Sequence, residues 1–501
     1  MNTFKPHRTL LVLMCVTLTL VLSVGTVKAS RTLQAETDFA AIDAYVTEQM
    51  NNLGIPGMAL GIVQDGQIAH LGGFGVADSS GRAVTPQTPF YLASVTKSFT
   101  TLAVMQLVEA GKIDLDAPVQ TYLPWFELAD KEASAQITVR NLLSHTTGIS
   151  TQDGNRDLFS QQGLEETVRG LGNVSLTRPV GRSYQYSNLN FVIAGLIVEK
   201  VSGQSYADYV TQHIFEPLDM RHSHASQALA LADGLSEGHH YMFGHTFKWE
   251  RPVPPSQLPE GYLIASAEDM SHYALAQLND GRYGDTSILS PQGIAELHDP
   301  ATATNEGDEH YALGWAVGAL DGIPIVYHTG DLGHFSTIIL LMPDLGSGVV
   351  LLANATGFEQ LAQANQIAIG VVSLLNGKSP APVSVPVRLR FLYWAILLAP
   401  LLMILGIALS WRYWRNKGLG HILLVVLLYG GVAALWLLVV PPLIGAPVWS
   451  VIRIQINHPE LAYALTAGII LGIGWSVVYT VMNLRAMRSL GWPGATSHAV
   501  S

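Results

Sequence analysis

The sequence predicts a mixed α/β domain followed by helices that cross a membrane. Three observations predict this organisation: strand-like patterns at both ends of a long first region, helical patterns between them, and a strongly apolar C-terminal region. Of the 501 residues, 49% are hydrophobic and only 13% are charged, about half the charged share of a typical soluble protein. The low charge content therefore indicates segments embedded in lipid.

The N-terminus has the pattern of an export signal. Basic residues precede an apolar run over residues 10–24, and Val27 and Ala29 supply the small side chains that a signal peptidase requires. We expect residues 1–29 to be a signal peptide cleaved near Ala29, with an uncleaved anchor as the alternative. In both cases the domain that follows is exported.

Residues 38–376 are expected to form the mixed α/β domain. Two strands joined by the turn Asp65-Gly66 are predicted near its start, and more strands are predicted near its end. The predicted strands cover residues 59–63, 67–71, 323–327, 336–341 and 348–353, and helices are predicted over 98–110 and 190–201. Strands at both ends imply one sheet built from both ends of the domain.

The composition changes after this domain. Residues 377–388 form a proline-rich linker, and residues 389–483 contain three uncharged apolar runs. These runs are residues 391–410, 422–445 and 461–482, each about long enough to cross a bilayer as a helix. Core helices of a soluble domain are the alternative, but three such runs in succession argue against it.

Basic residues predict the orientation of these helices. Arg412, Arg415 and Lys417 lie between the first and second runs, and further arginines follow the third. Both groups, with the tail at 484–501, would lie in the cytoplasm. The α/β domain would then be extracytoplasmic, in a multi-pass protein of the plasma membrane with lipid as one partner. Gly468 and Gly472 form a small-xxx-small pair that can pack helices closely.

Charge and cysteine content exclude several classes of function. A net charge of -11 argues against a nucleic-acid partner, which requires a basic face. The single cysteine, Cys15, lies in the N-terminal apolar run, so the domain has no disulfide framework, cysteine zinc site or thiol nucleophile.

Ser94 and Lys97 form the first chemical motif. Ser94 follows an extended segment and precedes a helical pattern, and a serine in that position is usually only a helix cap. A lysine three residues later, however, lies on the same face of the helix and brings an amine beside the hydroxyl. A lysine among apolar groups loses its proton more readily and can serve as a base.

Two further motifs follow in the chain. Tyr186 and Asn188 lie two residues apart in a polar loop, where both side chains can point into one cleft. The phenol can relay a proton and the amide can hold a substrate carbonyl. Taken alone, such a loop would more simply cap the next helix.

The third motif, His328-Thr329-Gly330, ends a predicted strand. An exposed strand edge with a glycine allows a substrate backbone to approach and pair with it. The backbone N–H of Asp331, together with that of Ser94, could form an oxyanion hole. Alone, this motif fits a strand that simply runs into a turn.

Together, the motifs resemble the class C β-lactamase and D-Ala-D-Ala carboxypeptidase family of serine hydrolases, which also contains esterases and D-amino-acid peptidases. Ser-x-x-Lys, Tyr-x-Asn and His-Thr-Gly occur in that family's order and approximate spacing over about residues 39–375. The resemblance implies a serine β-lactamase-like α/β (α+β) fold, with a mixed antiparallel sheet flanked by helices and an all-helical region. The site would lie between the two parts.

The resemblance also implies roles for residues. Ser94 would be the nucleophile, with Lys97 and Tyr186 as the proton-transfer pair and Asn188 as a substrate ligand. The resemblance requires no metal or other cofactor. Five histidines between residues 222 and 245 show no spacing that fits a zinc site. His145 is expected to be structural.

His328 departs from the β-lactamase pattern, in which this position usually carries lysine. Unperturbed histidine is only partly charged at neutral pH, so activity on an anionic substrate should fall between about pH 6 and 8. The negative charge of Asp331 further disfavours anionic substrates.

The sequence therefore predicts an extracytoplasmic serine hydrolase that forms an acyl-enzyme at Ser94. Its substrate would be a small peptide, a β-lactam or an ester, with D-Ala-D-Ala-type peptidase or esterase activity favoured over true β-lactamase activity. One alternative is a penicillin-binding receptor or sensor that is acylated without turnover. An idle scaffold is a second alternative, against which the complete set of motifs argues.

Overall fold

A computed structural model describes most of the chain. The described residues are 37–155, 161–250, 252–304, 307–357, 363–384, 387–412, 419–438 and 459–489. The predicted signal segment lies outside them, as do residues 439–458 and most of the predicted tail.

An eight-stranded antiparallel sheet forms the centre of the α/β domain. Its strand order is β2-β1-β14-β13-β12-β11-β10-β9, so strands from both ends of the domain lie side by side, as predicted. The strands are β1 (Gly57–Gln64), β2 (Gln67–Gly75), β9 (Thr302–Ala303), β10 (His310–Tyr311), β11 (Ala316–Leu320), β12 (Ile323–Asp331), β13 (Ser336–Met342) and β14 (Ser347–Ala353).

The β1–β2 hairpin forms at the predicted turn. Asp65 and Gly66 connect the strands with φ values of 49° and 76°. Two successive left-handed residues match the right-handed twist of a two-residue hairpin, and Asp-Gly is one of the pairs that favour it. The turn therefore sets the pairing next to it, Gln64 with Gln67 and Val63 with Ile68.

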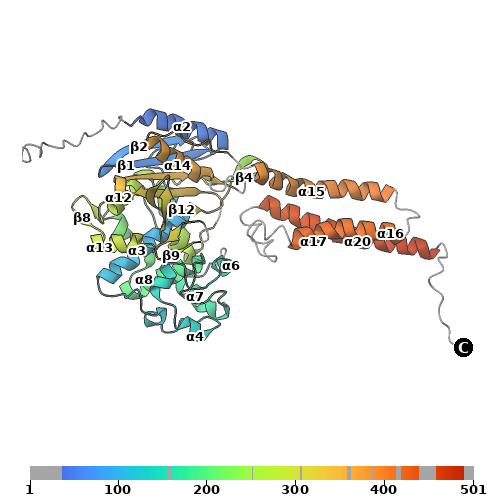
Figure 1. Cartoon of the computed structure of the whole chain (residues 1–501), viewed down its shortest axis with the longest axis horizontal. Coiled ribbons are helices and arrows are strands. Elements are labelled where there is room, and N and C mark those ends of the chain that lie inside the picture. The colour runs from blue at the N-terminus through green and yellow to red at the C-terminus, as the bar shows by residue number, and fades with distance from the viewer. Residues whose placement is uncertain are drawn as a thin grey trace, which may run out of the picture. The chain divides into compact units, whose positions relative to one another are not determined.

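Helices cover both faces of the sheet (Figure 1). Every residue of β13 and β14 is buried, because α12 (Ala267–Leu278) and α14 (Gln363–Leu375) both pack against these strands. Gly61 of β1 allows α12 to approach, since a Cβ there would lie only 2.2 Å from Ser271 Oγ. The centre of the sheet is thus an interior layer rather than a surface.

A mainly helical region lies beside the sheet and is built around α3 (Thr96–Glu109) and α8 (Asn188–Ser202), which pack together. The other helices of the domain are α2 (Phe39–Leu53), α4 (Lys131–Ser134), α5 (Val139–Leu143), α6 (Thr151–Gly154), α7 (Leu164–Arg169), α9 (Tyr206–Val210), α10 (Gln227–Ala232), α11 (Leu258–Gly261) and α13 (Pro291–His298). The domain also contains the short strands β3 (Phe90–Tyr91), β4 (His239–Met242), β5 (His245–Lys248), β6 (Ile264–Ala265), β7 (Arg282–Tyr283), β8 (Thr286–Ser287) and β15 (Ala355–Thr356).

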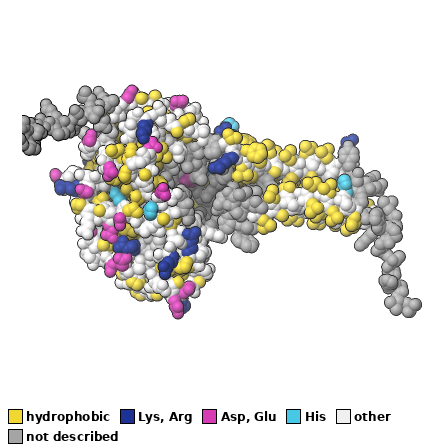
Figure 2. All heavy atoms as spheres, viewed as in Figure 1, with side chains coloured by type: hydrophobic (Ala, Val, Ile, Leu, Met, Phe, Trp, Pro, Cys, Tyr) yellow, Lys and Arg dark blue, Asp and Glu magenta, His cyan; other side chains and the backbone are white. Residues whose placement is uncertain are grey.

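Among the described residues, the α-helices that follow the proline-rich segment are α15 (Val387–Arg412), α16 (Leu419–Val425), α17 (Gly431–Leu438) and α20 (Pro459–Ser489). Figure 2 shows that hydrophobic side chains cover much of their surface. Among the described residues, two helical stretches, Arg390–Arg412 and Glu460–Ala486, are long and apolar enough to cross a membrane. They contain the first and third predicted runs. The described part of the second run lies in the shorter apolar helical stretch Leu419–Leu435. The structure therefore shows two of the three predicted membrane-spanning helices as long enough to cross a membrane, and the third stays a prediction.

Gly472 of α20 provides a close contact within this helical segment. A Cβ at Gly472 would lie 2.6 Å from the Tyr429 carbonyl oxygen and 2.8 Å from Ala433 Cβ. The glycine therefore packs α20 against helices of the same chain, which is one of the uses of a small-xxx-small pair.

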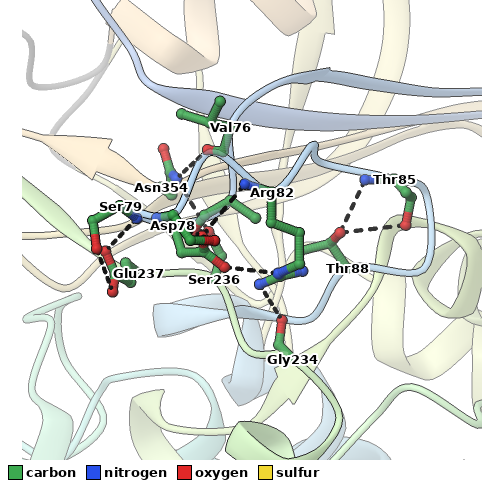
Figure 3. A network of polar contacts seen from close by, with 12 residues as sticks. Val76, Asp78, Ser79, Arg82, Thr85, Thr88, Gly234, Ser236, Glu237 and Asn354 are labelled. Carbon is green, nitrogen blue, oxygen red and sulfur yellow. Dashed lines mark hydrogen bonds and ion pairs between the residues drawn. The ribbon is translucent and has the colours of Figure 1, made fainter.

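A polar network fastens the end of β14 to distant loops (Figure 3). The buried Asn354 side chain accepts a hydrogen bond from the Gly57 N–H at 2.8 Å and donates to the Val76 carbonyl and to Ser236 Oγ, both at 3.1 Å. Nearby, Arg82 contacts Asp78 at 2.7 Å, and hydrogen bonds from Ser80 and Arg82 lower the pKa of Asp78 to about 2. Asn354 thus satisfies polar groups from three segments at once.

We expect Asn354→Ala to lower the free energy of unfolding by about 3 kcal/mol, because the buried Gly57 N–H and Ser236 hydroxyl lose a partner. Thermal and denaturant unfolding would measure this loss, with Asn51→Ala on the exposed side of α2 as the control. A loss no larger than that of the control would show that the network contributes nothing to stability.

Candidate active site

Ser94 lies in a tight turn between β3 and α3. The 3-10 turn Ala93–Val95 carries it, and Ala93 has a φ of 49°, a left-handed conformation that costs an alanine roughly 1–2 kcal/mol. Neither this turn nor α3 has a side-chain cap at its N-terminus. Ser94 therefore does not cap α3, and its hydroxyl faces the residues described next.

Gly330 of β12 makes room for this turn. A Cβ at Gly330 would lie 2.5 Å from the Leu92 carbonyl oxygen and 2.8 Å from Ala93 Cβ. The Leu92 carbonyl also accepts a hydrogen bond from Thr337 of β13 at 2.6 Å. The sheet therefore holds the backbone on the N-terminal side of Ser94.

The structure brings Ser94, Lys97 and Tyr186 together. Lys97 Nζ lies 3.1 Å from Ser94 Oγ, and the Tyr186 hydroxyl lies 2.8 Å from the same oxygen. Lys97 is completely buried, with its Nζ 5.0 Å from the centre of the Tyr186 ring. These contacts match the arrangement of a nucleophile with adjacent proton-transfer groups.

Glu260 is a residue of this cluster that the sequence did not reveal. Its carbonyl oxygen and its Oε2 lie 2.6 Å and 3.2 Å from Lys97 Nζ, and its side chain is only 4% exposed. Glu260 lies in the four-residue helix α11, more than 160 residues from Lys97. An isolated acidic residue at that separation carries no sequence signal.

His145 supports the Tyr186 ring. The two rings lie 4.4 Å apart, and His145 Nδ1 accepts hydrogen bonds from the Ser187 N–H and the Asn190 side chain. Burial, with the nearby charge of Lys97, lowers the pKa of His145 well below its usual range. His145 is therefore a neutral packing residue behind Tyr186.

His328 differs from the expectation of a titrating substrate ligand. It is 5% exposed, its Nδ1 lies 2.7 Å from the Thr329 carbonyl oxygen, and its Nε2 lies 3.0 Å from the Tyr311 hydroxyl. These contacts satisfy a neutral ring, and burial, with the charge of Lys97, lowers its pKa to about 3. The expected charge change of His328 between pH 6 and 8 is therefore wrong.

Residues 328–331 of β12 have an open edge, as the motif led us to expect. β13 pairs with this part of β12, but β11 pairs only with residues 323–327, and no other described strand covers that edge. The Asp331 carboxylate accepts hydrogen bonds from the Gly333 N–H at 2.8 Å and from Thr356 Oγ1 at 2.6 Å. These bonds fix the loop that follows the strand.

Asn188 lies at the first turn of α8, two residues after Tyr186. Its side-chain amide donates to Asn155 Oδ1 at 3.0 Å, while its own buried Oδ1 has no hydrogen-bond partner among the described residues. Asn188 does not line the cavity described below, so its expected contact with substrate stays a prediction.

A cavity of about 640 Å³ opens at Ser94 and extends along β11 and β12, a volume within the usual range for small-molecule sites. Thr329, Gly330 and Asp331 line it, together with aromatic and acidic side chains. Its other charged or aromatic lining residues are Tyr184, Tyr186, Glu309, Tyr311, Tyr327 and His328. Among its described lining residues there is no lysine or arginine.

The histidines between residues 222 and 245 separate into different environments. His222 Nδ1 and His224 Nε2 contact Asp233 at 3.0 Å and 2.8 Å, whereas His239 and His240 lie on β4. Over the described residues, no three histidine, cysteine or acidic side chains gather as they would around a metal ion.

Comparison with models of known protein families shows to which family this chain belongs. Residues 42–373, which span the α/β domain and its site, match the family model described as Beta-lactamase. The chain belongs to the beta-lactamase family. This match does not separate class C from the other members of the family.

Three relatives illustrate how this beta-lactamase family member compares with known proteins. Protein flp of Staphylococcus aureus strain MW2 is 27% identical over 393 residues, covering 76% of each chain. The unguisins hydrolase ungD' of Aspergillus campestris is 31% identical over 337 residues, covering 64% of this chain and 61% of the relative. The solved octameric penicillin-binding protein homologue of Pyrococcus abyssi superposes with a TM-score of 0.61 at 27% identity, covering 69% of this chain and 79% of the other.

The buried neutral histidines predict sensitivity to acid. Burial lowers the pKa of His298 from 6.5 to about 4 and contributes to the value of about 3 for His328. Below pH 6.5 the unfolded chain binds protons at these positions while the folded chain does not, so stability falls as the pH falls. Each histidine should cost about 1.4 kcal/mol of unfolding free energy per pH unit until its folded pKa is reached.

Unfolding measured between pH 7.5 and 4.5 tests this prediction. In the wild type, His298 Nε2 lies 3.1 Å from Gln277 Oε1. His298→Gln should reduce the dependence of Tm on pH, because a glutamine side chain does not take up a proton in this pH range. His245→Gln, at an exposed position, is the matched control. Equal pH dependence in the His298 variant and the wild type would contradict the assignment.

Proposed function

We propose that this chain is a membrane-anchored extracytoplasmic serine hydrolase that acts through an acyl-enzyme at Ser94. Its preferred substrates are peptides, amides or esters without a free carboxylate beside the scissile bond. Among the activities of the family, this description favours an esterase, or a peptidase whose substrate lacks such a carboxylate, over a true β-lactamase and over the D-Ala-D-Ala-type peptidase that the sequence led us to expect. The observation that carries the proposal is the contact of Ser94 Oγ with both Lys97 and Tyr186 at the mouth of the cavity.

The proposed reaction has two steps. In the first, Ser94 Oγ attacks the substrate carbonyl carbon, an ester bond forms, and the bond to the leaving group breaks. The Ser94 proton passes through the Lys97 and Tyr186 pair to the leaving group. In the second step water attacks the ester, gives its proton to the same pair, and releases the acid while Ser94 regains its hydroxyl. The backbone N–H groups of Ser94 and Asp331 are the proposed donors to the developing oxyanion.

The charge of the cavity supports the substrate preference. Glu309 and Asp331 line it, whereas the position at which a β-lactamase usually carries lysine holds the neutral His328. A substrate carboxylate placed there would meet like charges without a cationic partner, and such juxtaposition costs affinity. A neutral ester or amide avoids that cost. The hydrolase named among the relatives supports turnover rather than a receptor that only binds.

The exposed apolar surface of the C-terminal helices supports membrane anchoring. In the most apolar parts of Arg390–Arg412 and Glu460–Ala486, only 22% and 44% of residues are buried. Leu401 and Leu402 are 61% and 65% exposed, unlike leucines of a soluble core helix. Lipid is the solvent that such surfaces require. Arg412 at the end of α15 and Arg485 near the end of α20 favour a cytoplasmic location for those ends.

Ser94→Ala should abolish covalent labelling of the full-length protein by a fluorophosphonate probe, because the nucleophilic oxygen is removed. Intact-mass analysis of the detergent-solubilised protein measures the adduct. Ser287→Ala, at an exposed position of β8, should label like the wild type. An adduct that persists in the Ser94 variant would assign the nucleophile elsewhere.

The substrate preference can be tested with two depsipeptides that differ only in a free carboxylate or its methyl ester. We expect kcat/KM to be about tenfold or more higher for the methyl ester, a difference of about 1.4 kcal/mol. Glu309→Gln removes a negative charge from the cavity and should bring the kcat/KM values of the two depsipeptides closer together. Glu237→Gln, outside the cavity, should leave the ratio of these two values unchanged. A preference for the free carboxylate would overturn the proposed substrate class.

A further inference from the structure

The cavity at Ser94 is lined from both faces of the central sheet. Gly330 of β12 faces the turn that carries Ser94, because a Cβ there would lie 2.8 Å from Ala93 Cβ. Successive residues of a strand point to opposite faces, so Thr329 and Asp331, which also line the cavity, face the other side. The cavity therefore passes from one face to the other across the part of β12 that β11 leaves unpaired.

On the face away from Ser94, aliphatic side chains line the cavity. Ile338 of β13 pairs with Thr329 of β12, and directly opposed residues of antiparallel strands share a face. The helix α14 packs against β13 and contributes to the same lining. We call this part of the cavity the far compartment, and its aliphatic lining residues are Ala316, Leu320, Ile325, Ile338, Leu340 and Ile369.

The lining of the far compartment fits an uncharged chain. Glu309, which also lines the cavity, already has a partner within the protein, because the Tyr327 hydroxyl donates a hydrogen bond to its carboxylate. A charged group that moved in among the aliphatic side chains would lose its hydration, which costs free energy. An aliphatic chain that leaves water for the same surface gains free energy.

We propose that the far compartment binds the aliphatic chain of an acyl donor, so that the substrates are esters or amides of aliphatic acids. This proposal rests on the proposed function and names its substrate class. In the acyl-enzyme the leaving group has departed and the acyl group stays bonded to Ser94. A chain that is held through both steps of the reaction therefore belongs to the acyl group. An acetyl group ends beside Ser94, whereas a longer chain crosses the edge of β12 and enters the far compartment.

Leu320 and Ile369 are suitable positions at which to alter the far compartment. They belong to different elements, β11 and α14, and both are only partly buried. Ile338 and Leu340, by contrast, are 3% and 1% exposed and belong to the interior of the sheet. Substitutions at Leu320 and Ile369 therefore change the lining with the least disturbance of the core.

The test compares the p-nitrophenyl esters of acetic and octanoic acid as substrates of the full-length, detergent-solubilised protein. Both esters have the same leaving group, so the ratio of their kcat/KM values reports the acyl chain. Each methylene that is fully buried contributes about fourfold to binding. Because only part of the octanoyl chain needs to be buried, we expect a ratio of at least about tenfold in favour of octanoate. A lower ratio would overturn the proposal.

Two variants locate the preference in the far compartment. Leu320→Gln places a polar amide against the chain, and Ile369→Phe occupies part of its space. Each should lower the octanoate-to-acetate ratio by at least about fivefold. Leu229→Gln and Leu231→Phe, at exposed positions of α10, are the matched controls and should keep the wild-type ratio.

The ratio separates a change of specificity from damage to the fold. A poorly folded variant loses activity on both esters, and partition of octanoate into detergent is the same for every variant. If one of the two variants fails to fold, the other still decides, because they lie in different elements. A wild-type ratio in the folded variants would overturn the proposal.

The outcome also distinguishes this proposal from the proposed function. If neither ester is hydrolysed and a fluorophosphonate does not label Ser94, the proposed function itself is refuted. Normal labelling of Ser94 without the octanoate preference would refute only the role of the far compartment. A preference for octanoate that both variants reduce would support both proposals.

Discussion

The contact between β12 and the turn that carries Ser94 is the constraint on which the site depends. Gly330 has no side chain, so the strand lies directly against Leu92 and Ala93. The left-handed Ala93 reverses the chain before Ser94, and the hydrogen bond from Thr337 to Leu92 holds that backbone to the sheet. β12 and β13 come from the end of the domain and Ser94 from its beginning. The site therefore forms only when the two ends of the domain have come together in the folded protein.

Electrostatic balance around Ser94 follows from this enclosure. Burial makes single charges costly, and the chain places a carboxylate against the buried Lys97 while it keeps the two nearest histidines neutral. The Tyr311 hydroxyl and the Thr329 carbonyl satisfy both ring nitrogens of the neutral His328, and Nδ1 of the neutral His145 accepts two hydrogen bonds. The charge beside Ser94 is therefore localised on one ion pair, and the surrounding rings of His145, His328 and Tyr186 supply shape and polar contacts.

The sequence was sufficient for the features that depend on local pattern. The Asp65-Gly66 hairpin, the sheet built from both ends of the domain, and the proximity of Ser94, Lys97 and Tyr186 all followed from spacing or from the family resemblance. Two features could not be predicted in this way. Glu260 reaches Lys97 only through tertiary packing, and the state of His328 depends on burial against Tyr311, which no pattern of residue types reveals. The sequence shows that His328 replaces the lysine of the β-lactamase pattern. The expectation that His328 titrates near neutral pH, however, used the pKa of an exposed histidine.

The neutral His328 changes what the open edge of β12 can recognise. A lysine at that position would attract a carboxylate, and recognition would rest on charge. Here residues 328–331 offer backbone groups along an edge that no described strand covers, beside tyrosines and two carboxylates. Backbone pairing with an extended acyl donor depends on its amide or ester groups rather than on a terminal charge. Under the proposed function, selection at this site would therefore rest on the main chain of a substrate rather than on its end, and the cavity along β11 and β12 offers room for that main chain.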